Sequence, residues 1–201
     1  MGAAKTAFAK SGYRRTHIDQ IAEELDIGKG TIYRYFKDKK RLFIAVFEQT
    51  LYGLQSQIGE YVEPIENPVE KIKDAVRTYF EYFEQDHEQI EIMMQARSEF
   101  KQDYRRVFLE LYEDYILKIQ DNLRAGMEQG LFRDLDIGHT AGAISAVLQG
   151  SLQNYYIRSF GDTAQGEGHA RDIAPEKLTD RSEAVAELIL SGLLKRNQDS
   201  S

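Results

Sequence analysis

Two short helical patterns, separated by a tight turn, stand near the start of the chain. The first pattern has Thr16 and Asp19 at the spacing of a capping box, and its apolar residues recur on one face of a two-turn helix. Three residues ending in Gly28 then interrupt the pattern, and Gly28 is able to take the positive φ that a tight turn needs. Ile32 and Phe36 resume an apolar face four residues apart. This order of helix, turn and helix predicts a helix-turn-helix.

The second of these helices and the segment after it are rich in positive charge. Residues 28–43, GKGTIYRYFKDKKRLF, contain six Lys and Arg residues against the single carboxylate of Asp38, and aromatic residues are interleaved with them. Such a stripe is typical of a nucleic-acid contact, although basic runs are more often plain solvated surface. The preceding helix and turn favour the nucleic-acid interpretation, because the second helix of a helix-turn-helix lies in the major groove.

Residues 8–47 resemble the DNA-binding domain of the TetR family of bacterial regulators. The matching features are the Gly12-Tyr13 pair at the end of the first helix, Thr16, Ile21-Ala22, Lys29-Gly30-Thr31, the aromatic residues Tyr33, Tyr35 and Phe36, and the Lys39 and Leu42 that open the family's fourth helix. So many fixed spacings within about 40 residues argue against a chance match. Position 28, often Ser in the family, is Gly here, so the side chain at this position has no hydroxyl to contact phosphate.

We therefore predict a DNA surface on the second helix of the motif and the start of the next helix. It comprises Thr16, Lys29, Gly30, Thr31, Tyr33, Arg34, Tyr35, Lys37 and Lys39. We expect direct base reading from Lys29, Thr31 and Arg34, phosphate contacts near Thr16 and Lys37, and backbone contacts that fix the register from Tyr33, Tyr35 and Lys39.

The charge is distributed unevenly along the chain. The net charge of −7 over 201 residues argues against an indiscriminate binder of polyanions. Residues 1–46, however, hold ten Lys and Arg against five Asp and Glu, so they carry +5 and the remainder carries −12. An acidic body helps to orient the basic end toward DNA. The chain has no cysteine, no signal-peptide pattern and no 18-residue apolar run, so we expect a cytoplasmic protein without disulfides, a thiolate metal site or a membrane span.

Helical periodicity continues through the rest of the chain. We expect helices near residues 3–11 and 39–60, from Val69 to Phe83, and over 87–98, 101–129, 137–160 and 179–196, with Gly130 and Asp136 at helix ends and a polar loop over residues 161–176. No segment alternates with a period of two. The predicted fold is all-α, with a three-helix helix-turn-helix domain at residues 1–46 and a larger helical domain at residues 47–201 for ligand binding and dimerisation.

The helices expected at 137–160 and 179–196 are apolar on more than one side. A helix with two apolar faces is buried on two sides. One face can meet the core of the same chain, and small residues such as Gly142 and Gly150 would let a second backbone approach closely. We therefore predict a homodimer through these two helices; burial within one chain is the alternative, and the resemblance favours the dimer.

The middle helices carry an excess of large, adaptable side chains beside a few polar ones. Ordinary core is the simpler interpretation for each residue alone. The combination of adjacent methionines, tyrosines and Arg97 suits a mainly apolar ligand with one polar or anionic end. The predicted ligand-binding residues are Tyr79, Phe83, Met93, Met94, Arg97, Phe100, Tyr104, Phe108, Tyr112, Gln149 and Tyr155.

The sequence favours regulation over two rival classes of function. An enzyme is disfavoured because the carboxylates fall at helix-surface spacings, the four histidines are isolated and no phosphate-cradling loop or nucleophile elbow occurs. A helical adaptor would bind protein alone and would need no salt-dependent affinity for duplex DNA. We expect a homodimeric, ligand-responsive transcriptional regulator without a cofactor, which binds a near-palindromic operator. Repression is the commoner outcome in the resembled family, and activation is the alternative.

Overall fold

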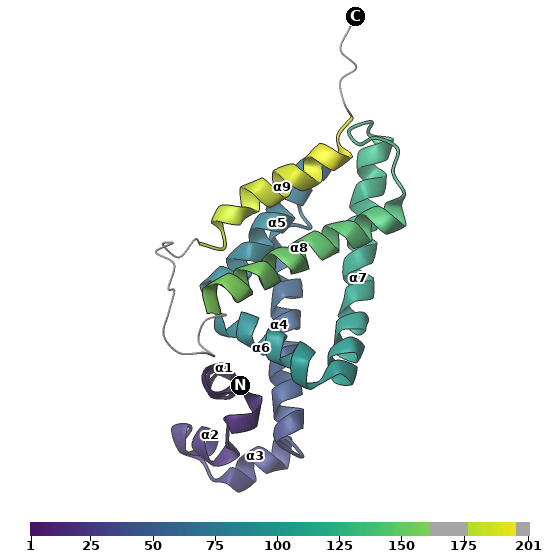
Figure 1. The fold of residues 1–201 in the computed structure, drawn as a ribbon. Coiled ribbons are helices and arrows are strands. Elements are labelled where there is room, and N and C mark those ends of the chain that lie inside the picture. Colours follow the sequence, from purple (N-terminus) through teal and green to yellow (C-terminus); the bar gives the residue numbers. More distant parts are fainter. Residues whose placement is uncertain (161–176, 196–201) are drawn as a thin grey trace, which may run out of the picture. The chain divides into compact units, whose positions relative to one another are not determined.

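The computed structural model describes residues 1–160 and 177–195, and these residues are almost entirely helical, which confirms the predicted all-α fold (Figure 1). The predicted loop at 161–176 lies outside the described residues. The helices are α1 (Gly2–Arg15), α2 (Ile18–Glu24), α3 (Lys29–Tyr35), α4 (Lys39–Tyr61), α5 (Pro68–Gln85), α6 (Glu88–Glu99), α7 (Lys101–Glu128), α8 (Ile137–Phe160) and α9 (Asp180–Leu193). In this part of the chain no helix is both long and apolar enough to cross a membrane.

The chain divides into two compact units. The amino-terminal unit contains residues 1–55 and 86–112, and the carboxy-terminal unit contains residues 56–85 and the described residues after 112. Two helices, α4 and α7, therefore belong partly to each unit. The boundary between residues 46 and 47, which we drew from the sequence, stays a prediction.

The first helix departs from the expectation that it stops at Gly12. It continues to Arg15 across a bend at Gly12, whose φ of 77° and ψ of 152° are not helical. Thr16 follows the bend and is fully buried; its hydroxyl donates to the carbonyl oxygens of Gly12 at 2.8 Å and Ala7 at 3.1 Å. The expected capping box of Thr16 and Asp19 is therefore wrong, because the hydroxyl is already used on α1.

The cap of α2 lies one residue later. His17 flanks the helix, and its backbone N–H donates to the side-chain oxygen of Gln20 at 3.3 Å. This bond satisfies a donor that the start of a helix would otherwise leave unpaired.

The turn of the helix-turn-helix also differs from the expectation. The residue with a positive φ is Asp26, at 51°, whereas Gly28 has an ordinary φ of −69°. The N–H of Asp26 donates to the carbonyl of Glu23, and the N–H of Ile27 donates to the carbonyl of Ala22, each at 3.0 Å. These two bonds form a Schellman motif, which requires the left-handed residue directly after the last helical turn. The position at which α2 ends, and not the presence of a glycine, therefore determines that Asp26 is the residue with a positive φ.

Side-chain caps fix the starts of three longer helices. Asp38 accepts from the N–H of Arg41 at 2.7 Å at the start of α4, and Asn67 accepts from the N–H of Val69 at 2.9 Å at the start of α5. The predicted cap of α8 is confirmed, since Asp136 accepts from the N–H of His139 at 2.9 Å. Each bond satisfies a donor that a helix leaves unpaired at its N-terminus.

Candidate DNA-binding surface and ligand cavity

An aromatic cluster holds α1 and α6 against α4 in the amino-terminal unit. The ring of Phe43 on α4 lies 5.1 Å from that of Phe8, 5.4 Å from that of Tyr13 and 5.3 Å from that of Phe100, measured between centroids. Phe8 and Phe43 are fully buried. Aromatic pairs at these separations add to the area that they bury, so the cluster provides a rigid support behind the helix-turn-helix.

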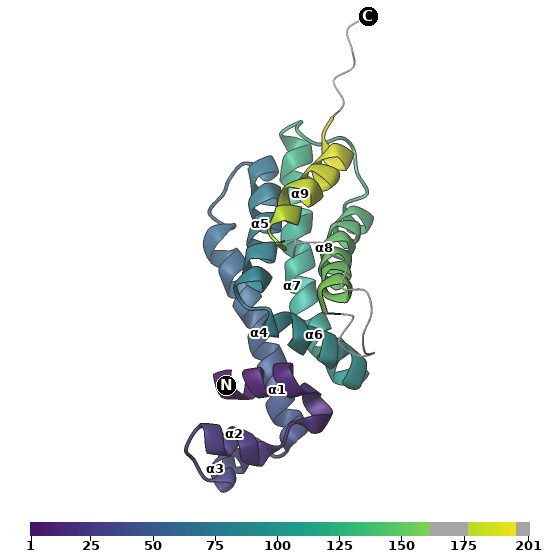
Figure 2. The ribbon, with the colours of Figure 1, turned by 60° about the vertical axis from the view of Figure 1, so that its left-hand side comes forward.

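Helices α1 and α6 lie side by side in the amino-terminal unit (Figure 2). A polar network joins them at the bend of α1. The side-chain amide of Gln95 on α6 donates to the carbonyl of Phe8 and accepts from the N–H of Tyr13, both at 2.9 Å. Further along α1, Thr6 donates to Glu88 at 2.8 Å and Arg14 pairs with Glu99. Helix α6 thus makes hydrogen bonds with the α1 backbone on both sides of the bend at Gly12. It also contacts the α1 side chains of Thr6 and Arg14.

The outward face of α3 carries several residues of the predicted DNA surface. Tyr35 is 71% exposed and Tyr33 is 42% exposed. The guanidinium of Arg34 lies 5.2 Å from the centroid of the Tyr35 ring. Gly30 has open space where a Cβ would stand, so backbone can approach a partner closely there. This face offers a planar guanidinium and two aromatic rings, which are groups suited to base edges and phosphates.

Lys29 at the start of α3 is held by a residue of α2. Its ammonium lies 2.8 Å from the carboxylate of Asp19 and 5.9 Å from the centroid of the Tyr33 ring. The hydrogen bond that Lys29 donates to the Asp19 carboxylate raises the pKa of Lys29. The ion pair is exposed, so its net stabilisation is small and a phosphate can replace the carboxylate.

Lys39 and Thr16 lie deeper than the other predicted DNA contacts. The ammonium of Lys39 donates to the carbonyls of Thr16 at 2.9 Å and Arg14 at 3.2 Å, and it lies 4.6 Å from the centroid of the Tyr13 ring. This geometry makes Lys39 a cross-link between α4 and the end of α1. By contrast, Thr31 lies on α3 and is partly exposed, and Lys37 lies just after α3 and is exposed. The phosphate and base roles that we assigned to these four residues stay predictions.

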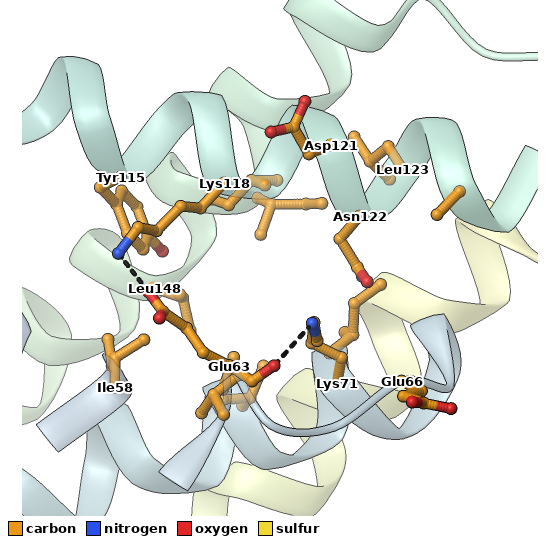
Figure 3. Close-up of a pocket in the computed structure, with 17 residues that line it drawn as sticks. Ile58, Glu63, Glu66, Lys71, Tyr115, Lys118, Asp121, Asn122, Leu123 and Leu148 are labelled. Atoms are coloured by element: carbon orange, nitrogen blue, oxygen red, sulfur yellow. Dashed lines mark hydrogen bonds and ion pairs between the residues drawn. The ribbon is translucent and has the colours of Figure 1, made fainter. Parts of the chain in front are cut away.

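The carboxy-terminal unit contains a cavity of about 320 Å³ between the end of α4, α5, α7 and α8 (Figure 3). The buried side chains of Ile72, Val76, Leu123 and Leu148 line its apolar part. Its polar part includes Glu63, Glu66, Lys71, Lys118, Asp121 and Asn122. None of the residues that we predicted for ligand binding lines this cavity.

The predicted ligand-binding residues fall into two groups, one in each unit. Met93, Met94, Arg97, Phe100, Tyr104, Phe108 and Tyr112 belong to the amino-terminal unit, whereas Tyr79, Phe83, Gln149 and Tyr155 belong to the carboxy-terminal unit.

In the amino-terminal group, Tyr104 stacks between Phe47 and Phe108, with each pair of centroids 5.5 Å apart. Burial raises the pKa of Tyr104, and the nearby charge of Arg97 partly opposes this rise. Arg97 thus lies near the stacked rings, and the ligand role of these residues stays a prediction.

Helices α8 and α9 leave apolar surface exposed in the carboxy-terminal unit. Leu188 on α9 is 63% exposed, and it borders a hollow with Ala143 and Val147 of α8. On α8, Gly142 and Gly150 have open space where a Cβ would stand. This face has the composition that we expected of a subunit interface. Within residues 1–160 and 177–195, no group of three or more His, Asp or Glu side chains is placed to hold a metal ion.

Comparison with known protein families identifies both parts of the chain. Residues 1–46 match the family model described as bacterial regulatory proteins of the tetR family. Residues 66–155 match the model described as a tetracyclin repressor-like C-terminal domain. The second match covers most of α5 to α8, where the sequence motifs alone were weak.

Individual relatives agree with these matches. The chain is 23% identical to the fatty acid metabolism regulator protein of Bacillus subtilis (strain 168) over 67% of this chain and 70% of that protein. It is 28% identical to the HTH-type transcriptional repressor KstR2 of Mycobacterium tuberculosis over 67% of this chain and 68% of that one. The crystal structure of the transcriptional regulator FadR from Bacillus subtilis in complex with stearoyl-CoA superposes with a TM-score of 0.77, covers 95% of this chain and 96% of its own, and is 21% identical.

Proposed function

The chain belongs to the TetR family of bacterial regulatory proteins, and on that premise we propose that it is a homodimeric repressor that a small, mainly apolar effector releases from its operator. Regulators of this family bind operator DNA as dimers and bind small-molecule ligands, and they are not enzymes. The observation that carries the proposal is the exposed face of α3, where Arg34, Tyr33 and Tyr35 stand clear of the support formed by α1, α4 and α6.

On this proposal α3 enters the major groove of DNA. Arg34 and Thr31 contact base edges, and Lys29 exchanges the carboxylate of Asp19 for a base or a phosphate. Tyr33, Tyr35, Lys37 and Lys39 hold the sugar-phosphate backbone and fix the register. Because Gly30 has no side chain, the α3 backbone itself can lie close to the duplex.

A dimer through α8 and α9 would give the protein two such helices. The exposed Leu188 and the open surface over Gly142 and Gly150 support this interface, because burial of an exposed leucine is favourable and glycine permits close contact between backbones. A two-fold dimer presents one α3 to each half of a near-palindromic operator, whose half-sites lie about 34–36 Å apart.

The effector is proposed from the relatives and from the apolar interior. The similar fatty acid metabolism regulator and the similar structure with bound stearoyl-CoA support an apolar effector for this chain. Helices α4 and α7 each run from one unit into the other. A conformational change in the carboxy-terminal unit can therefore be transmitted along these helices to the helix-turn-helix. The effector must bind the DNA-incompetent state more tightly than the competent one, and operator affinity falls by no more than that difference.

Selection of genomic fragments tests this proposal. The protein is incubated with fragmented DNA of its source, the bound fragments are sequenced, and each bound promoter is fused to a reporter in strains with and without the gene. We expect the bound fragments to share a near-palindromic site, and we expect reporter expression to rise when the gene is absent. Fragments without a common two-fold site would contradict operator recognition, and reporter expression that falls in the absence of the gene would make the protein an activator.

A further inference from the structure

The cavity of the carboxy-terminal unit has an apolar body and a charged side. Its apolar body is built from helices that are distant in sequence, with Ile72 and Val76 from α5, Leu123 from α7 and Leu148 from α8. Its volume of about 320 Å³ lies at the lower end of the range for small-molecule sites, roughly 300–1,000 Å³. A ligand that fills it must therefore be small and largely hydrocarbon.

Two lysines reach the charged side from opposite helices (Figure 3). Lys71 projects from α5 and Lys118 from α7. Of the carboxylates in the lining, Asp121 already pairs with Arg124 at 2.6 Å. The amide of Asn122 donates to the carbonyl of Pro68 at 3.0 Å. Lys71 and Lys118 are the cationic residues of the lining, and they lie there beside the carboxylates of Glu63 and Glu66.

A single residue in the connection between α4 and α5 links the two lysines. The carboxylate of Glu63 pairs with the ammonium of Lys118, and the backbone carbonyl of Glu63 accepts from Lys71 at 3.2 Å. Asp114 lies 3.6 Å from Lys118 on the same helix. The hydrogen bond that Lys118 donates to Glu63 is the main cause that raises the pKa of Lys118, so this lysine stays charged at neutral pH.

A ligand can replace Glu63 on the two lysines at little cost in protein stability. The side chains of Lys118 and Glu63 are 43% and 52% exposed, and exposed ion pairs contribute little to stability. A carboxylate that arrives on a ligand restores the same charge pairing when Glu63 turns to solvent. The hydrogen bond of Lys71 becomes stronger, because an anionic carboxylate replaces the neutral carbonyl as its acceptor. Hydrogen bonds between charged partners are stronger than those with a neutral partner.

We propose that this cavity binds a medium-length aliphatic carboxylate, whose headgroup replaces Glu63 on Lys118 and Lys71 and whose chain lies against the apolar body. A quaternary ammonium headgroup in that same position, in contact with Lys118 and Lys71, would lie beside two like charges, and an alcohol there would gain no charge pairing. The inference rests on the proposed function only in taking this ligand as the effector. The binding itself is independent of DNA.

Calorimetric titration of the full-length protein without DNA tests the inference. The probes are decanoate, decanol and decyltrimethylammonium, which share one alkyl chain and differ in headgroup charge. We expect decanoate to bind most tightly. Lys118→Met should weaken decanoate roughly tenfold and leave decanol unchanged, because it removes one charged hydrogen bond. Glu63→Gln should tighten decanoate, because it removes the competing carboxylate.

Two control variants make the result specific. Lys73→Met removes a lysine from the same helix as Lys71, but Lys73 pairs with Glu70 outside the cavity lining, so decanoate affinity should not change. Arg97→Ala removes the cation that the sequence predicted for an anionic ligand, and it too should leave decanoate unaffected. Thermal unfolding of each variant checks that it is folded.

The inference is overturned if decanoate and decanol bind equally, if the ammonium probe binds best, if wild-type protein binds none of the three, or if Arg97→Ala rather than Lys118→Met loses decanoate. Operator selection that succeeds while these titrations fail would leave the proposed function standing and remove only this ligand site. Decanoate that binds as expected without any effect on DNA affinity would leave the site standing and remove its role as the effector site.

Discussion

Leu188→Glu is expected to weaken binding to a two-fold operator by at least about a hundredfold, although residue 188 is far along the chain from every predicted DNA contact. Leu188 is 63% exposed on α9 and borders the hollow shared with α8. In the proposed dimer the substitution buries one unpaired carboxylate from each protomer, which is strongly unfavourable. A monomer retains one α3 and one half of the operator contacts, and each lost 1.4 kcal/mol costs about tenfold in affinity.

Sedimentation equilibrium and operator titration of the same samples check this result. Leu117→Glu is the matched control, because Leu117 is 57% exposed on α7 and lies outside the α8 and α9 face. The control should sediment as a dimer and bind the operator normally. An undisturbed dimer for Leu188→Glu would show that the interface lies elsewhere.

Phe132→Ala is expected to lower the free energy of unfolding by about 3–5 kcal/mol, the usual cost of truncating a buried phenylalanine. Phe132 follows α7, is 1% exposed and packs directly on Gly126, where a Cβ would stand only 2.1 Å from the ring. Its backbone also pairs with Leu194 after α9. The ring therefore fills a gap that exists only because residue 126 is glycine.

Urea unfolding at a fixed protomer concentration measures this effect, because unfolding of a dimer depends on concentration. Tyr61→Ala truncates an aromatic residue that is 57% exposed and should cost less than about 0.5 kcal/mol. Gly126→Ala should cost roughly 1–3 kcal/mol by overpacking. A Phe132→Ala variant as stable as Tyr61→Ala would contradict the packing described for this corner.

Helix positions were predictable wherever a capping residue stands within a few residues of the start or end of an apolar periodic segment. Asp136 was identified as a cap because a short polar side chain stands directly before an apolar periodic segment, and it accepts from His139 as expected. Gly130, expected at the end of α7, has a φ of 72° two residues beyond it. These features depend on local bonding, so no tertiary information was needed.

Two local expectations failed because a competing bond decided the outcome. The spacing of Thr16 and Asp19 fits a capping box, but the Thr16 hydroxyl bonds back to α1 across the bend at Gly12. Gly28 tolerates a positive φ, but the Schellman bonds place that conformation at Asp26. In both cases the sequence offered two chemically suitable residues, and only the geometry of the preceding helix end chose between them.

The two candidate sites differ in how readable they were. The proposed DNA surface comes from one continuous segment, so its residues could be named before the fold was known. The cavity gathers Glu63, Lys71, Lys118 and Leu148 from three helices and a connection. In the sequence, Glu63, Lys71 and Lys118 look like ordinary charged residues of a solvated surface. Only the approach of α5 to α7 joins them into one site.

Salt-dependent binding to a random duplex tests the central claim most directly. Fluorescence anisotropy of a labelled duplex is measured from about 50 to 200 mM salt for the wild-type protein, Lys37→Ala and Asp19→Asn. A dimer that contacts six or more phosphates should lose roughly a thousandfold in affinity over this range. Lys37→Ala should weaken binding and lower the slope by about one, whereas Asp19→Asn, which frees Lys29, should strengthen binding. Affinity that is independent of salt, or that responds to neither substitution, would contradict the account of this protein as a reader of DNA.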